Sequence, residues 1–138
     1  MTIKEIQEQL VEEFALFTDW MEKYEYLIEQ GKDLAPFPEE KKQEGNLING
    51  CQSRVWLYSE LRDGRLFFAA DSDAIITKGI ASLLVKVFSG QRPQDIVDAD
   101  LDFLDRIGLK ENLSPTRANG LLAMVKQIKY QALAHTSS

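Results

Sequence analysis

Residues 53–70 read SRVWLYSELRDGRLFFAA, and this stretch decides the fold class. Apolar and polar or aromatic residues alternate through its first half, which is the period-two pattern of a strand with one buried face. Asp63-Gly64 at its centre is a strong signal for a two-residue hairpin turn, and the aromatic run after it is typical of a returning strand. We therefore predict an antiparallel β-hairpin, to which residues 46–48 add a third strand.

Helical periodicity dominates the chain before the hairpin. Two helices are expected within residues 3–30, with Asp19 as the cap of the second and Gly31 as its stop. The prolines of residues 34–38 forbid regular structure, and the polar stretch 39–45 is expected to be solvated.

The chain after the hairpin also reads as helical. Residues 71–73, Asp-Ser-Asp, are expected to cap a buried helix that ends at Gly90, and Pro93 opens a short helix. Ser114-Pro115 begins the last helix, with serine as cap and proline at the first helical position. Because the strands are clustered rather than alternating with helices, the pattern favours an α+β fold, a small antiparallel β-sheet packed on helices. A length of 138 residues predicts a single domain over residues 1–138.

Composition excludes several classes of function. The net charge of −6 disfavours binding to nucleic acid or to an anionic membrane surface, which depends on an excess of lysine and arginine. No apolar run approaches the ~20 residues of a membrane span, and the N-terminus lacks the pattern of a secretory signal. We therefore expect a cytoplasmic protein, in which a cysteine stays reduced.

Cys51 is the one cysteine of the chain, and it directly precedes the hairpin. A thiolate–imidazole metal site needs three or four ligands, whereas the chain has one cysteine and one histidine, so we expect no bound metal. A cysteine hydrolase needs a positioned base, and His135 near the C-terminus is a poor candidate. Thiol–disulfide exchange would need a second, resolving cysteine. A carrier that accepts a group on sulfur needs only the thiol, which Arg54 or Arg117 could keep ionised.

A lone cysteine in a cytosolic protein is more often a small buried apolar residue than a reactive group. Here, however, it lies between the turn residue Gly50 and the polar pair Gln52-Ser53, not within an apolar stripe. From the residues alone, an inert thiol and a carrier thiol both stay open.

The run Leu47-Ile-Asn-Gly-Cys-Gln-Ser-Arg-Val-Trp56 resembles the SufE-type sulfur-acceptor proteins, also called cysteine desulfuration proteins. Three further stretches agree in order and spacing, namely residues 71–79, 93–96 and 113–121. The resemblance therefore covers nearly the whole chain. It implies the α+β fold that this family shares with iron–sulfur scaffold proteins of the IscU type, which keep three cysteines where this chain has one.

The resemblance also implies a function. Such proteins partner a PLP-dependent cysteine desulfurase, SufS-like or a paralogue. The acceptor takes the enzyme's persulfide sulfur onto its own cysteine, here Cys51, stimulates the enzyme, and delivers sulfur to an iron–sulfur scaffold. On this interpretation PLP belongs to the desulfurase, and the chain itself needs no cofactor and catalyses nothing alone. The alternative from another class is an allosteric activator that binds a desulfurase without carrying sulfur.

Supporting roles follow for the neighbours of Cys51. Gly50 would let the loop reach into a partner, and Gln52 and Ser53 would support it. Asp73 would place the start of a helix beside the loop, and Arg117 would stabilise anionic sulfur or contact the partner. Val55 and Trp56 are expected to be strand residues of the core, with shielding of the sulfur as a second role for Trp56.

Overall fold

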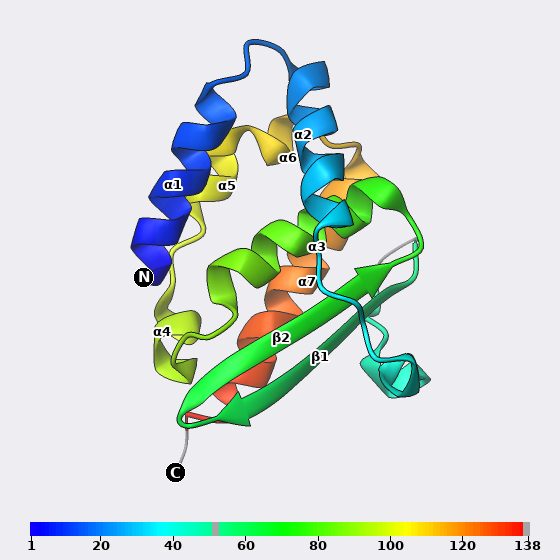
Figure 1. Ribbon diagram of the computed structural model, residues 1–138, viewed down its shortest axis with the longest axis vertical. Helices are drawn as coiled ribbons and strands as arrows, with labels where there is room; N and C mark the ends of the chain where they lie inside the picture. The colour runs from blue at the N-terminus through cyan, green and yellow to red at the C-terminus, as the bar shows by residue number, and fades with distance from the viewer. Residues whose placement is uncertain (51–52, 137–138) are drawn as a thin grey trace.

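The computed structural model describes residues 1–50 and 53–136, with the backbone alone at Lys110. Its elements are α1 (Ile3–Ala15), α2 (Trp20–Lys32), the 3-10 turns η1 (Glu39–Lys41) and η2 (Glu44–Asn46), β1 (Val55–Arg62), β2 (Arg65–Ser72), α3 (Ile75–Phe88), α4 (Pro93–Asp98), α5 (Asp102–Ile107), α6 (Leu109–Asn112) and α7 (Pro115–Leu133). Figure 1 shows the hairpin running diagonally across the lower half of the molecule, against α3 and α7, with α1, α2, α5 and α6 in the upper part. The predicted α+β class is confirmed.

The β-hairpin forms as predicted. Strands β1 and β2 pair antiparallel from Val55 opposite Ser72 to Arg62 opposite Arg65. Asp63 and Gly64 have φ angles of 51° and 78°, the left-handed values that a two-residue hairpin turn requires. The predicted third strand is wrong for residues 46–48, which contribute an isolated bridge between Leu47 and Trp56 in place of a ladder.

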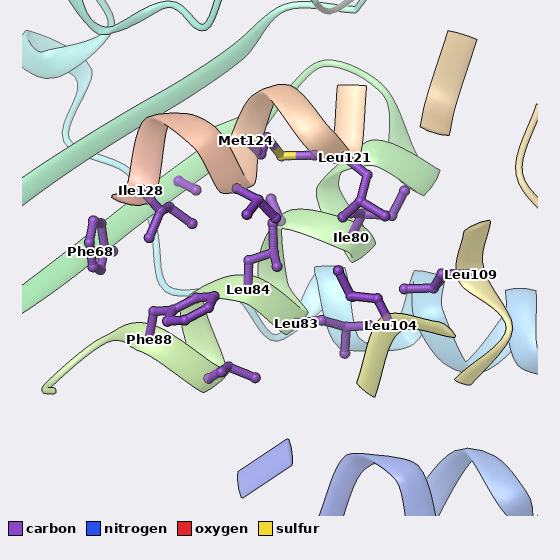
Figure 2. Packing of buried hydrophobic residues seen from close by; sticks show 14 of the residues in the cluster. Phe68, Ile80, Leu83, Leu84, Phe88, Leu104, Leu109, Leu121, Met124 and Ile128 are labelled. Carbon is purple, nitrogen blue, oxygen red and sulfur yellow. The ribbon is translucent and has the colours of Figure 1, made fainter. Parts of the chain in front are cut away.

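Helix α3 is the centre of the core. Its apolar residues contact β2 on one side and α7 on another, and much of α3 is buried. Each large apolar side chain that is fully buried contributes roughly 1.5–3 kcal/mol. Figure 2 shows this packing through Phe68 of β2, Ile80, Leu83, Leu84 and Phe88 of α3, and Leu121, Met124 and Ile128 of α7.

Helices α2 and α3 cross at two glycines. The prediction that Gly31 stops α2 is wrong, because the helix continues to Lys32. Gly31 is buried against Gly79 of α3, and a Cβ atom on Gly31 would lie 2.9 Å from the Gly79 nitrogen. Real Cβ contacts are not that short, so this crossing requires the absence of a side chain at both positions.

The last helix begins as predicted. Ser114 is its N-cap, and its side-chain oxygen accepts a hydrogen bond from the Arg117 amide across 3.3 Å, while Pro115 occupies the first helical position. The first turn of α7 lies near the start of α3, because Ser114 and Thr116 line the same pocket as Ala74 and Thr77.

Candidate functional site

Residues 49–54 form the segment between two paired backbone positions. The amide of Ile48 donates to the carbonyl of Val55 across 2.9 Å, and Leu47 bridges Trp56. The chain therefore lies beside the start of β1 at Leu47 and Ile48, and it enters β1 at Val55. Cys51 and Gln52, two of the predicted site residues, lie in this segment but outside the described residues.

Gly50 lies before Cys51 in the sequence and packs near α7. Its φ angle is 94°, a left-handed conformation that side chains other than glycine rarely adopt. A Cβ atom at this position would meet the Cβ of Ala123 at 3.5 Å, which is ordinary van der Waals contact. The backbone angle, rather than the space around it, therefore favours glycine here.

Arg54 is fastened to the end of β2. Its amide donates to Oδ1 of Asp73 across 3.1 Å. Its carbonyl accepts from the Ser72 hydroxyl at 2.8 Å and from the Asp73 amide at 3.3 Å. Ser72 and Asp73 thus hold both backbone groups of Arg54, so the C-terminal flank of the loop is tied to the entrance of α3.

These bonds correct one prediction. Asp73 and Ser72 were expected to cap α3, but the N-cap is Ala74, and no side chain of the described residues caps this helix. Ser72 Oγ accepts from the Ala74 amide across 3.2 Å, one position before the helix. The expected juxtaposition of Asp73 with the loop is present, but it arises from the strand pairing and not from a helix cap.

The predicted residues Ser53 and Arg117 line one pocket of about 290 Å³. The pocket lies where the loop flank meets the first turns of α3 and α7. Asp73 does not line it and instead faces the Arg54 amide. The described residues that line the pocket are Ser53, Ala74, Thr77, Ser114, Thr116, Arg117 and Gly120.

A cluster of charges that sequence reasoning missed links the connector before the loop, residues 39–45, to β2 and α3. Lys42 lies 2.9 Å from Asp71 Oδ2, and its ammonium also lies 5.2 Å from the centre of the Trp56 ring. Lys78 of α3 lies 3.4 Å from the other oxygen of Asp71. The expectation that residues 39–45 are simply solvated is therefore wrong at Lys42. No local sequence pattern indicates an ion pair between residues 29 positions apart.

Asp71 is ionised more readily than a free aspartate. Burial raises the pKa of its carboxyl, but the hydrogen bonds from Lys42 and the Ser72 amide, with the charges of Lys78 and Lys42, outweigh burial and lower the pKa below its usual value. The hydrogen bond to Asp71 in turn raises the pKa of Lys42. Asp71 of β2 is therefore a charged tie, because its ion pairs with Lys42 and Lys78 link β2 to the connector and to α3.

The expectations for the strand residues Val55 and Trp56 have different outcomes. Val55 is fully buried in the core as predicted. Trp56 points to the opposite face of the hairpin, where it is half-buried beneath Lys42, so its placement in the core is wrong.

His135 lies beyond the far end of α7 from the pocket. Helix α7 has 19 residues, so its two ends are roughly 28 Å apart at 1.5 Å per residue. His135 is exposed there. The geometry therefore gives no support to the use of His135 as a base at the pocket.

Comparison with known proteins decides the family. The family model described as "SufE: Fe-S metabolism associated domain" matches residues 8–132. The chain belongs to the SufE family. A SufE-like protein of Rhizobium meliloti is 39% identical over 130 residues, covering 91% of this chain and 93% of that protein. A SufE-like protein of Synechocystis is 38% identical over 126 residues, covering 91% of this chain and 79% of that protein.

The SufE fold also appears among solved structures. The solution structure of a hypothetical protein from Thermus thermophilus matches with a TM-score of 0.79 at 21% identity, over 96% of this chain and 97% of that chain. Membership of the SufE family places the chain in iron–sulfur metabolism. None of the described helices is long and apolar enough to span a bilayer.

Proposed function

We propose that the protein is a sulfur acceptor that carries sulfur on Cys51. Its family is associated with iron–sulfur metabolism, and Cys51 is the one cysteine in its sequence. These two observations together carry the proposal, because sulfur transfer without a metal site requires a single nucleophilic thiol. The donor is the persulfide of a PLP-dependent cysteine desulfurase, and the recipient is an iron–sulfur scaffold. PLP stays with the desulfurase.

The transfer balances without an added oxidant or reductant. The Cys51 thiolate attacks the outer sulfur of the desulfurase persulfide and forms a new sulfur–sulfur bond. The old sulfur–sulfur bond breaks, and the desulfurase cysteine leaves as a thiolate. One sulfur atom moves to Cys51, and its removal frees the desulfurase for another turnover, which accounts for stimulation.

The fixed flanks of the loop support this role. Residues 49–54 are flanked by the hydrogen bond from the Ile48 amide to the Val55 carbonyl, and the Arg54 amide donates to the Asp73 carboxylate. A carrier must present its thiol to two partners in turn. A loop with anchored ends has fewer conformations to lose when it binds, so each presentation costs less conformational entropy.

Intact-protein mass spectrometry without reductant tests the proposal. We expect a mass gain of one sulfur atom after incubation with a cysteine desulfurase, PLP and free cysteine, reversed by dithiothreitol and absent in Cys51→Ser. Cys51→Ser should also fail to stimulate the desulfurase. If Cys51→Ser stimulated the enzyme as the natural chain does, the carrier proposal would be wrong and a non-carrier activator would be favoured.

A further inference from the structure

The described residues that line the pocket beside the loop are mostly polar, and none of them is negatively charged. The described residues that line it include four hydroxyl side chains, on Ser53, Thr77, Ser114 and Thr116. Arg117 carries the one charge among these lining residues, and it is positive. A pocket with this lining offers hydrogen-bond donors and no carboxylate, which suits an anion.

Two helices begin at this pocket. Ala74 and Ser114, the N-caps of α3 and α7, both line it. Neither helix has an acidic residue in its first turn, and no described side chain caps α3. The positive ends of two helix dipoles therefore lie at one site, with amides of the first turn of α3 that lack the usual cap.

Thr77 supplies an independent observation. The residue is 8% exposed, and within the described chain its hydroxyl has no hydrogen-bond partner. The Thr77 oxygen nevertheless reaches solvent. In the described residues, the polar side-chain atoms that are buried with neither solvent nor a partner are Trp20 Nε1 and Gln131 Oε1. Because Thr77 lines the pocket, the pocket is where its hydroxyl meets solvent. A buried hydroxyl left open in this way is available to a ligand.

From these observations we propose that the pocket between the starts of α3 and α7 binds a small anion. Arg117, the Thr77 hydroxyl and the uncapped amides of α3 are its donors. The anion has two possible sources, a free oxyanion or the terminal sulfur of a persulfide carried on Cys51. The second source rests on the proposed function, whereas the site itself does not.

A sulfate titration of the Cys51→Ser protein tests the site apart from sulfur transfer. At constant ionic strength, with chloride as the balancing anion, we expect saturable shifts in the NMR signals of the Ile76, Thr77 and Thr116 amides. Thr77→Val, which keeps the shape and removes the hydroxyl, and Arg117→Gln should each weaken sulfate binding about tenfold. Arg92→Gln, an exposed arginine outside this pocket, is the matched control and should leave it unchanged.

The result that overturns the proposal is a linear, unsaturated response of these amides, or a response that Thr77→Val and Arg117→Gln do not alter. A second arm identifies the source. If the natural chain loaded with sulfur binds sulfate more weakly than the unloaded chain, the persulfide occupies the site, and if both bind it equally, the site serves free oxyanions. Failure of loading on Cys51 would count against the proposed function alone, because the sulfate arm uses Cys51→Ser.

Discussion

The amide of Arg54 donates to the carboxylate of Asp73 across 3.1 Å, which ties the segment after Cys51 to the end of β2. Ser72 reaches the same residue from the other side, at the Arg54 carbonyl. Because Ser72 and Asp73 immediately precede α3, any force on the loop flank acts directly on the entrance of that helix. Movement of the Arg54 backbone therefore requires these bonds to open first.

Asp73→Ala is expected to loosen this flank. The variant loses one hydrogen bond, which is worth about 0.5–1.5 kcal/mol, while the Asp73 amide can still donate to the Arg54 carbonyl. Hydrogen exchange of the Arg54 amide, followed by NMR, should accelerate roughly fivefold for each 1 kcal/mol lost. Glu25→Ala, at an exposed position of α2, is the control and should leave this amide unaffected. Unchanged exchange in Asp73→Ala would mean that the bond does not hold the flank.

Much of the fold follows from local pattern. The hairpin was predictable because strand alternation and an Asp63-Gly64 turn act within a few residues of one another. The start of α7 was predictable because the Ser114 cap and Pro115 act on the adjacent turn. Both signals are short-range physical preferences that tertiary packing leaves intact.

The candidate site was less predictable, because its contacts join distant segments. The pocket takes Ser53 from the loop, Thr77 from α3 and Arg117 from α7. Sequence pattern singled out Ser53 and Arg117 but not Thr77, since a threonine inside a helix carries no mark of an open hydroxyl. The Lys42–Asp71 pair was missed for the same reason, because a lysine in a polar stretch reads as solvated until its partner is placed.

Gly79→Ala is expected to destabilise the fold. At a solvent-exposed helical position, alanine would gain about 1 kcal/mol over glycine. At Gly79 the new Cβ would collide with the carbonyl group of Leu27, and backbone atoms cannot rotate away. We expect the free energy of unfolding to fall by about 2–3 kcal/mol, measured by urea denaturation. The control Gly45→Ala has nothing within 4 Å of the added atom and should stay within about 0.5 kcal/mol of the natural chain. A neutral Gly79→Ala would show that α2 and α3 do not cross this closely.

Asp71→Asn is expected to change how stability depends on pH. The pKa of the Asp71 carboxyl is lower in the folded protein, so ionisation favours folding above the unfolded pKa of about 3.9. That contribution disappears as the pH falls through the folded pKa. The natural chain should exceed Asp71→Asn in free energy of unfolding by about 1 kcal/mol at pH 7, and the difference should shrink below about pH 4.

Urea denaturation of both chains between pH 3 and pH 7 measures this difference. Asp33→Asn, an exposed aspartate at the end of α2, is the matched control, and its difference from the natural chain should not follow the same course. A gap between the natural chain and Asp71→Asn that stayed constant over the whole range would refute the charged tie through Lys42 and Lys78.

Ser72→Ala tests whether Ser72 and Asp73 act together in holding the Arg54 backbone. The Ser72 hydroxyl donates to the Arg54 carbonyl and accepts from the Ala74 amide, so its loss removes two bonds at a buried position. We expect a loss of about 1–3 kcal/mol, against little change in Ser59→Ala, a half-buried serine of β1 for which no side-chain hydrogen bond is found in the described chain.

The double variant Ser72→Ala/Asp73→Ala separates shared action from independent action. Once either side chain has lost its bond to Arg54, the other side chain holds a flank that is already less restrained. The double variant should therefore lose less free energy of unfolding than the sum of the two single variants, by about 0.5 kcal/mol or more, as residues in one hydrogen-bond network do. Strict additivity in urea denaturation would instead show that Ser72 stabilises the entrance of α3 while Asp73 alone restrains the loop, because only then would the two losses be independent.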